Sequence, residues 1–340
     1  MRIGQLDAKV RGVSAEMGRV CSRWMMNPLL VPAAEYIWHE QREHCGGWRR
    51  VPGRLIDLHC HSTWSDEHIR WLPGLTFHPL LGPRELYELA KRRGMDYVTI
   101  TDHDTIDGCK ALLDECGPLD DFIVGEEVTT RFPEDGTVIH VNVYDIDEAQ
   151  HREIQRLRGD VRDLADYLHR LGKLCVLNHM TWTQQHRPLK THHIETMVEL
   201  FGVFEVLNGT RSYAHNAFAH QVAARHGKVG VAGSDSHTDR VGTTYTVSAG
   251  ETAAELLANI RSGRAAVAGA FGTPERLRED VWLTLHVNVQ RRLDEAGGAW
   301  YRLACRTFER VGRLTYPLVC LGYHARQNLL IRRSLQAAAL

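Results

Sequence analysis

The run Asp57-Leu58-His59-Cys60-His61-Ser62-Thr63-Trp64-Ser65-Asp66 begins a scattered set of histidines and acidic residues, each placed where a strand gives way to a loop. A strand alternates its side chains, so His59 and His61 point to one side and Cys60 points to the other. Two imidazoles on rigid backbone form a clamp for a divalent metal, and Asp66 can add an oxygen ligand. Such a site generates hydroxide and therefore indicates hydrolysis, although a single His-x-His pair is equally compatible with packed or surface histidines.

Length and composition are typical of one large α/β domain with additional segments. The chain has 340 residues, a hydrophobic fraction of 43% and a formal net charge of -1. This leaves room for a domain of about 200–250 residues plus extensions. A near-neutral charge gives no global signal for nucleic-acid binding. The 20 histidines are compatible with metal chemistry but do not demonstrate it.

The cysteines and the first residues indicate a compartment. Eight cysteines are present without a Cys-x-x-Cys pair, and several lie in apolar runs such as Lys173–Leu177. They are typical of buried thiols in a reducing compartment rather than of a disulfide framework. The first twenty or so residues mix charges and contain no apolar core of a signal peptide. No apolar run reaches the roughly 18 residues that span a membrane, so we expect a soluble cytoplasmic protein.

Short β-rich runs alternate with helical patterns over residues 53–272. Repeated alternation of this kind predicts a parallel sheet, and the number of units favours a barrel. Glycine follows each predicted helix directly or within a residue, as expected at a helix end. We predict an N-terminal helical extension over residues 1–52, the barrel over 53–272 and a mainly helical segment over 273–340. The predicted strands are Leu55–His59, Tyr97–Thr101, Phe122–Val124, Val138–Val143, Leu174–Leu177, Val203–Leu207 and Val229–Ala232, and the predicted helices are Pro83–Arg93, Arg152–Leu171 and Ser212–His226.

The pattern changes beyond Pro274. Trp282–Gln290 alternates like a strand, whereas Ala299–Arg313 and Leu321–Ala339 are typical of helices. The basic residues of this segment are all arginines, and acids are few. This composition favours a solvated helical face that covers the barrel. A dimer contact and an RNA or membrane-surface patch are the alternatives.

Most of the later predicted strands carry or end in residues that can bind a metal. Because the carboxyl ends of parallel barrel strands open on one face, these side chains are expected to meet there. Independent strand ends that all offer His, Asp or Glu favour a polynuclear metal site over isolated structural residues. The residues concerned are Asp102-His103-Asp104, Gly125-Glu126-Glu127, His140, Asn178-His179 and Gly233-Ser234-Asp235-Ser236-His237.

In their order along the chain, these motifs resemble the PHP (polymerase and histidinol phosphatase) domain phosphoesterases. The resemblance extends over roughly residues 54–270 and implies a distorted (β/α)7 barrel with three divalent ions, Mn, Fe or Zn. It assigns one ion to His59, His61, Glu127 and Asp235. It assigns a second to Glu127 as a bridge with His140 and His179, and a third to Asp66, His103 and His237.

Other acidic residues near these ligands receive different roles. Family spacing selects Glu127 as the ligand, and strand alternation sends Glu126 to the opposite side, to the surface or behind the ligands. Asp102 and Asp104 flank His103 and are predicted to orient imidazoles rather than bind metal, which makes them candidate catalytic residues. Asp57 is a similar candidate.

Cations and aromatic residues near the strand ends are candidates for substrate binding. Arg211 follows a strand and can hold a phosphate with two parallel hydrogen bonds, which makes it a catalytic candidate as well. Arg187 and Lys190 lie in a cationic loop that can act as a lid or be merely solvated. Trp71 belongs to an insertion over Ile69–Gly82 that departs from the family pattern. This insertion either caps the site and stacks on a planar group or packs on the barrel.

The sequence therefore predicts a metal-dependent phosphoesterase acting on a small phosphate monoester or nucleotide. Cleavage of short oligonucleotide diesters and a histidinol-phosphatase-like activity are alternatives within the same chemistry. An amidohydrolase-type enzyme is less favoured because Glu127 occupies the place of a bridging carboxylated lysine. A non-catalytic scaffold is also less favoured, since all nine ligand positions are filled. We expect no stable nucleic-acid complex, and a homodimer through the terminal extensions is an open alternative.

Overall fold

The computed structural model describes residues 53–65, 67–68, 76–183, 187–294 and 298–337. These residues belong to one unit, Arg50–Leu340. The predicted N-terminal extension over residues 1–52 and two predicted site residues, Asp66 and Trp71, lie outside the described residues. The predicted domain boundaries therefore stay predictions.

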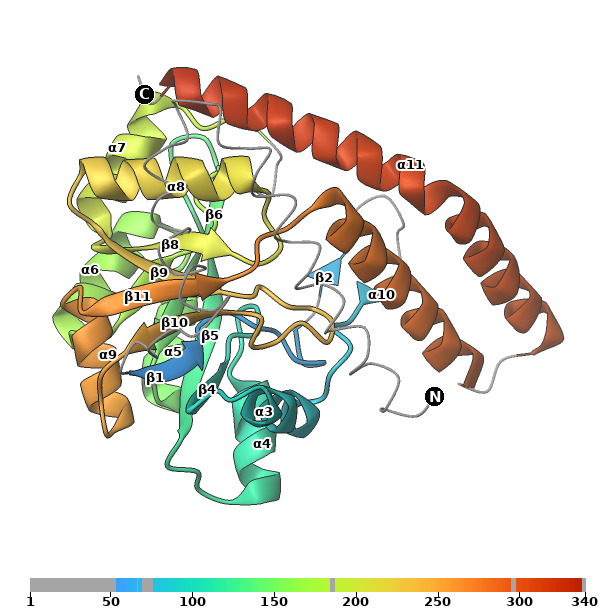
Figure 1. Ribbon diagram of the computed structural model, residues 1–340, viewed down its shortest axis with the longest axis horizontal. Helices are drawn as coiled ribbons and strands as arrows, with labels where there is room; N and C mark the ends of the chain where they lie inside the picture. Colours follow the sequence, from blue (N-terminus) through green and yellow to red (C-terminus); the bar gives the residue numbers. More distant parts are fainter. Residues whose placement is uncertain (1–52, 66, 69–75, 184–186, 295–297, 338–340) are drawn as a thin grey trace, which may run out of the picture. The chain divides into compact units, whose positions relative to one another are not determined.

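A nine-stranded sheet curls into a nearly closed barrel at the centre of the unit (Figure 1). Its strand order is β11-β10-β1-β4-β5-β6-β7-β8-β9. Side chains complete the closure, because Thr246 Oγ1 accepts a hydrogen bond from Ala232 N at 2.8 Å and donates one to Ala232 O at 3.0 Å. The strands are β1 (Arg54–Asp57), β4 (Tyr97–Ile100), β5 (Phe122–Arg131), β6 (Val138–Tyr144), β7 (Cys175–Leu177), β8 (Val203–Asn208), β9 (Val229–Gly233), β10 (Thr244–Ser248) and β11 (Ala265–Gly269).

The predicted parallel sheet is in fact mixed. β6 pairs antiparallel with β5 and β7, and β10 pairs antiparallel with β1 and β11. The reason for β6 is its short connection, since Phe132–Thr137 closes a tight hairpin that must return the chain beside β5. The other seven of the nine strands run in one direction, so the expectation of a distorted seven-unit α/β barrel is confirmed. Sequence reasoning missed β10 and β11.

Helices surround the barrel (Figure 1). The predicted helix Arg152–Leu171 is two helices, because Gly159 interrupts the pattern and the Asp160 side chain then caps the second helix by accepting from Arg162 N at 2.8 Å. That helix ends at Gly172, whose φ of 62° lies in the left-handed region that glycine tolerates. The helices are α3 (Pro83–Arg92), α4 (Asp107–Cys116), α5 (Glu148–Leu157), α6 (Val161–Leu171), α7 (Thr191–Leu200), α8 (Tyr213–Arg225) and α9 (Ala253–Arg261).

Apolar packing between these helices and the sheet holds the barrel. Leu164 and Leu168, one helical turn apart on α6, are fully buried in one cluster with Val141 and Val143 of β6. The apolar face of the helix, spaced by one helical turn, thus packs on the apolar face of the strand, spaced by two residues. The polar residues at the strand ends do not take part in this apolar packing, and they form the site described below.

Two further helices follow the barrel, α10 (Pro274–Asp294) and α11 (Ala299–Ala337). The predicted strand Trp282–Gln290 is wrong, because this segment lies within α10. Leu285 and Val289 are one helical turn apart and are buried together against α11, so the same apolar residues satisfy a helical period. The two predicted C-terminal helices are one, which continues through Pro317. Among the helices that the structure describes, none has an apolar stretch sufficient to cross a membrane.

Candidate metal centre

Glu127 stands at the centre of the predicted ligands. It lies on β5, its side chain is buried, and its two carboxylate oxygens face different histidines. Oε2 lies 3.1 Å from His59 Nε2 and 3.2 Å from His61 Nε2. Oε1 lies 3.1 Å from His140 Nδ1 and 3.2 Å from His179 Nε2. The carboxylate therefore bridges two groups of imidazoles.

Asp235 completes the first of these groups. It follows β9, and its Oδ1 lies 3.5 Å from both His59 Nε2 and His61 Nε2. The other oxygen, Oδ2, accepts hydrogen bonds from Thr210 Oγ1 at 2.7 Å and Arg211 Nη2 at 3.2 Å. Asp235 adopts a φ of 50°, a left-handed conformation that costs a non-glycine residue energy and often marks a functional site.

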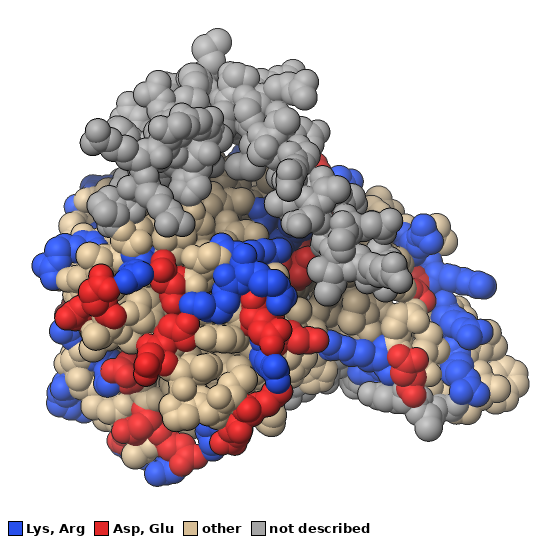
Figure 2. Space-filling model, turned by 60° about the horizontal axis from the view of Figure 1, so that its bottom comes forward, with Lys and Arg blue, Asp and Glu red and all other residues tan. Residues whose placement is uncertain are grey.

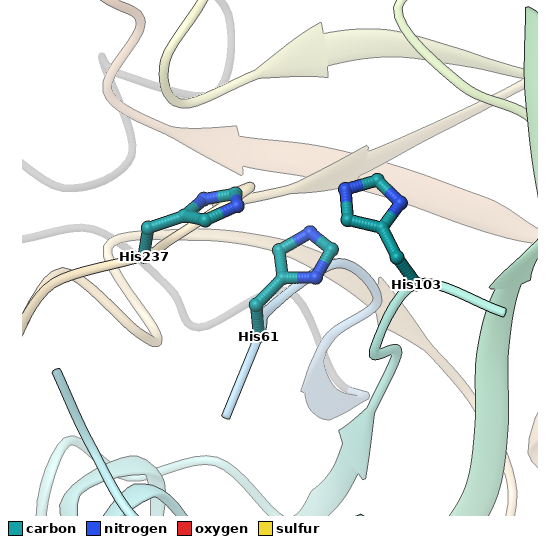
Figure 3. A group of neighbouring side chains, drawn as sticks. All are labelled: His61, His103 and His237. Carbon is teal, nitrogen blue, oxygen red and sulfur yellow. The ribbon is translucent and has the colours of Figure 1, made fainter. Parts of the chain in front are cut away.

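A third group lies beside the first (Figure 3). His61, His103 and His237 come from three separate strand ends and offer ring nitrogens within 4.8 Å of one another. The His61 ring lies 4.8 Å from that of His103 and 4.2 Å from that of His237, measured between centroids. His103 Nδ1 is also 3.4 Å from Glu127 Oε2. The third group is thus continuous with the Glu127 centre.

The position of His140 shows how the barrel brings the predicted ligands together. His140 lies near the start of β6, opposite Thr129 near the end of β5. Because β6 is antiparallel, its first residues lie at the same barrel end as the last residues of the parallel strands. His179 follows β7 directly and enters the same end. The expectation based on parallel strands alone therefore assumed the wrong direction for β6, and the structure nevertheless places His140 at the expected barrel end.

The arrangement of the nitrogen and oxygen atoms suits binding of divalent ions better than hydrogen bonding among these side chains. His61 Nε2 and His140 Nδ1 are buried and form no hydrogen bond, although each lies close to a Glu127 oxygen. Their separations from that carboxylate match the roughly 3.4 Å between ligands bound at about 2.1 Å to one tetrahedral ion. Buried nitrogens that converge without bonding are expected where a cation completes their coordination.

The electrostatics of the centre also favour a cation. Burial opposes ionisation of Glu127, but the nearby imidazoles of His59, His103 and His140 outweigh it and hold the pKa of Glu127 well below its usual range. Burial lowers the pKa of His140 to about 4, so its ring is neutral at pH 7 and keeps a lone pair for a metal. Asp235 likewise has a lowered pKa, because adjacent positive groups outweigh its burial.

Glu205, on β8, is a supporting residue that sequence reasoning missed. It is buried, and its Oε1 accepts a hydrogen bond from His59 Nδ1 at 2.9 Å. Its Oε2 accepts from the backbone N of His179 at 2.9 Å and from Asn208 Nδ2 at 2.9 Å. Since a carboxylate only accepts, His59 donates from Nδ1 to Glu205, and a metal ion bound at Nε2 would then meet its lone pair. An isolated acid within the apolar run Val203–Leu207 was the available signal.

Asp102 and Asp104, the acidic residues predicted to orient imidazoles, form hydrogen bonds with other groups. Asp102 accepts hydrogen bonds from Ser62 N and Ser62 Oγ, both at 2.6 Å, so it holds the loop after His61. Asp104 accepts from Thr129 N at 2.7 Å and pairs with Arg158 at 2.8 Å. Among the described residues, these hydrogen bonds are not to an imidazole, and the catalytic role of both acids stays a prediction.

Two further predicted acids also contact backbone or outer helices. Asp57 accepts from the backbone N of Ser234 at 2.8 Å and of Gly242 at 2.7 Å, tying the end of β1 to the loops after β9. Glu126 points away from Glu127, as predicted, but it is buried rather than at the surface. It contacts His151 Nδ1 and Gln155 Nε2 of α5, each at 2.9 Å.

Arg211 is the predicted substrate residue that lies at the centre. Besides Asp235, its guanidinium contacts the Tyr323 hydroxyl of α11 at 3.2 Å and lies over the Trp182 ring at 5.3 Å. The Trp182 ring is itself 5.0 Å from the His140 ring. Trp182 and Tyr323 were not expected from sequence. Trp182 lies three positions after His179, in a loop where only the charged residues were considered, and Tyr323 comes from a helix far along the chain. The aromatic residue that the structure places beside the predicted ligands is therefore Trp182, whereas the sequence had suggested Trp71.

The other predicted cations have different surroundings. Lys190 Nζ pairs with Asp135 Oδ2 of the β5–β6 hairpin at 2.6 Å, and Arg187 is exposed. Their substrate role stays a prediction. Lys173 precedes β7, at the barrel end opposite the ligands, and pairs with Asp145 at 2.7 Å. It is therefore not placed to bridge metals as a carboxylated lysine.

The insertion after Asp66 contacts α10 at its described end. The backbone N of His78 lies 3.4 Å from Asn288 Oδ1, and Asn288 Nδ2 donates to His78 O at 3.2 Å. The next residues reach the site, since Leu80 N donates to the carbonyl of His237 at 3.0 Å. The short strand β2 (Glu67–His68), which directly precedes the insertion, pairs with β3 (Thr76–Phe77) inside it.

Comparisons with known proteins agree with the sequence resemblance. A family model described as PHP-associated matches residues 214–265, and this match confirms the resemblance to PHP proteins. The matched segment runs from α8 to the first residue of β11. A comparison with curated proteins gave no significant sequence match.

Three solved structures are similar at low identity. A two-domain protein from Bacteroides vulgatus, described as containing a PHP-like metal-dependent phosphoesterase, is 19% identical, with 69% of this chain and 75% of that chain covered and a TM-score of 0.46. An amidohydrolase from Chromobacterium violaceum is 17% identical, with 55% and 89% covered and a TM-score of 0.43. A protein from Bifidobacterium adolescentis described as a metal-dependent phosphoesterase is 18% identical, with 58% and 91% covered and a TM-score of 0.38.

Proposed function

We propose that this protein is a metal-dependent phosphoesterase that hydrolyses a small phosphate monoester or a nucleotide. The observation that supports this most directly is the orientation of Glu127, whose two oxygens face two separate groups of imidazoles. A carboxylate in this arrangement suits a bridge between two divalent ions. Pairs of such ions are used to cleave phosphate esters.

The proposed ligand sets follow this geometry. One ion takes His59, His61, Glu127 and Asp235, and a second takes Glu127, His140 and His179. A third takes His103 and His237 together with Asp66, which lies outside the described residues. Mixed imidazole and carboxylate ligands suit Mn, Fe or Zn and do not choose among them.

Bound divalent ions would supply a hydroxide at neutral pH and neutralise the phosphate oxygens. The protein's own groups position the reactants. Glu205 fixes the tautomer of His59, and the φ of Asp235 aims one oxygen at the ligands while Arg211 holds the other. Arg211 Nε is buried without a hydrogen-bond partner, so the guanidinium retains a donor for a phosphate oxygen.

Trp182 supports a substrate with a planar or apolar part. Its ring lies beside both His140 and Arg211, so a group stacked on it would remain next to the ligands. This arrangement suits a nucleotide base or another ring attached to the phosphate. A histidinol-phosphate-like substrate and short oligonucleotide diesters remain alternatives within the same chemistry.

The test is phosphate release by protein loaded with Mn, Zn or Fe, measured on panels of monoesters and diesters. We expect turnover of at least one class, with activity and bound metal both lost in His59→Ala and Asp235→Ala. Absence of turnover on both panels by protein that elemental analysis shows to be loaded would reject the proposal. Hydrolysis of cyclic amides without phosphatase activity would identify an amidohydrolase, and a metal content near zero would identify a scaffold.

A further inference from the structure

Helix α11 exposes an apolar stripe to solvent. The helix has 39 residues and is about 58 Å long at 1.5 Å per residue. Leu314 and Leu318 near its middle are 79% and 71% exposed. Large apolar residues follow one another at intervals of three, four or eight positions, and this spacing places them on one face of the helix. We call this face the outer stripe; it consists of Leu303, Val311, Leu314, Leu318, Leu321 and Leu329.

The opposite side of α11 already has its packing partners. Cys320, Gln327 and Ile331 are buried there, and Tyr323 on that side contacts Arg211. Ser334 Oγ accepts a hydrogen bond from Leu189 N at 3.1 Å, which ties the end of the helix to the loop before α7. The outer stripe is therefore not needed to cover the barrel. Exposed apolar surface of this extent usually marks an interaction site.

Helix α11 is rich in arginines, of which Arg306 and Arg310 are exposed near the outer stripe, whereas Arg313 lies over the Trp282 ring of α10 at 5.8 Å. α11 contains seven arginines and one acidic residue, Glu309, so its formal charge is 7 − 1 = +6. Glu309 is turned toward α10, where it contacts His286 Nδ1 and Gln290 Nε2. No described ion pair involves an arginine of α11. Figure 2 shows blue side chains gathered at the right-hand end of the view, where α10 and α11 lie. The arginines are Arg302, Arg306, Arg310, Arg313, Arg326, Arg332 and Arg333.

We propose that the outer stripe of α11 lies on an anionic lipid surface. Leucines facing the acyl chains and arginines reaching the headgroups are the two features that such surfaces select. A second copy of the chain would match the apolar stripe but would bring another helix of charge +6 against the first. RNA would match the arginines but not the exposed leucines. The lipid surface alone satisfies both the apolar and the charged component.

Binding of the full chain to vesicles tests this proposal. We expect flotation with vesicles in which about a third of the lipid is phosphatidylserine, and none with pure phosphatidylcholine. Raising the salt from about 0.1 M to about 0.5 M should weaken binding, because it screens the arginines. Leu314→Gln combined with Leu318→Gln, which leaves the charge unchanged, should weaken binding at least tenfold. Val319→Gln, on the same helix away from the outer stripe, is the control and should bind as the unaltered protein does.

The charged component is tested separately. Arg306→Gln combined with Arg310→Gln should weaken binding to the anionic vesicles, by roughly fivefold for each arginine. Arg92→Gln on α3 is its control. These exposed substitutions lie outside the metal centre, so circular dichroism and phosphate release in solution should stay unchanged.

Three results would overturn the proposal. The first is absence of vesicle binding, or equal binding to neutral and anionic vesicles. The second is a dimer in light scattering that the paired leucine substitutions dissociate, without vesicle binding, which would identify a second copy as the occupant. The third is binding of RNA, without vesicle binding, that the leucine substitutions leave unchanged.

Discussion

Replacing Glu205 by glutamine tests whether the imidazoles bind metal. Glu205 accepts three N–H groups, from His59 Nδ1, the His179 backbone and Asn208 Nδ2. Glutamine has nearly the same shape but only one acceptor oxygen, so at least one of these donors would face its NH2 group. If the NH2 group faces His59, it forces the proton onto Nε2, the atom that faces Glu127 and Asp235.

The expected loss follows from this change of tautomer. Mutation of a carboxylate that orients a metal-binding histidine typically weakens metal affinity 10- to 100-fold, or about 1.4–2.7 kcal/mol. The unpaired donor should also lower the free energy of unfolding by about 1–3 kcal/mol. Metal affinity is measured by competition with a chromophoric chelator, and stability is measured by urea unfolding of metal-free protein.

Glu126→Gln is the matched control. Glu126 is the same residue type and is equally buried, but it hydrogen-bonds His151 and Gln155 on the outer side of β5. Its substitution should cost stability and leave metal affinity unchanged. The reasoning is refuted if Glu205→Gln binds metal as tightly as the unaltered protein, or if both substitutions weaken metal binding equally.

Four further predictions follow from single contacts. Arg211→Ala should raise KM for the phosphorylated substrate by tenfold or more with a smaller effect on kcat; an unchanged KM would remove Arg211 from the substrate site. Tyr323→Phe removes the hydroxyl that restrains Arg211 and should raise KM about threefold to tenfold without changing metal content, which elemental analysis checks. Burial lowers the pKa of His215 to about 3, so the unfolded chain binds the proton first and stability falls as pH drops below about 6.5. Urea unfolding should show a loss of roughly 2–3 kcal/mol from this group between pH 7 and pH 4.5 that is absent in His215→Gln, and an equal loss in both proteins would contradict the assignment. Gly233→Ala would place its Cβ 2.7 Å from the backbone N of His59, so both thermal stability and metal affinity should fall; tight metal binding by a stable variant would show that this close approach is unimportant.

Local chemistry explains why much of this protein could be predicted from its sequence. Gly172 ends α6 because a left-handed residue is required there, and glycine meets that requirement wherever it occurs. His59 and His61 share one side of the chain because strand alternation depends only on their spacing. The predicted ligands that the structure describes do meet at one barrel end. Their role as ligands depends on the family resemblance and stays a proposal.

The strand prediction for Trp282–Gln290 failed for a reason that also lies in periodicity. Apolar residues at positions 282, 285 and 289 fit a helix, while their neighbours also fit a short alternation, so the segment alone does not distinguish the two. The contact of Leu285 and Val289 with α11 decides for the helix. The strand β6 shows the same limit, since its direction depends on a hairpin connection rather than on its own residues.

What the sequence determined by itself is the set of chemically capable residues and the local elements that carry them, because spacing, turn chemistry and helix ends are properties of neighbouring residues. The tertiary structure alone decided which distant residues support them. Glu205 reaches His59 across 146 positions of sequence, and Tyr323 reaches Arg211 across 112. Such contacts depend on how β8 and α11 pack, and packing depends on the whole chain. The run His59-Cys60-His61 therefore predicts a pair of histidines able to bind a metal, and the folded barrel determines which residues surround that pair.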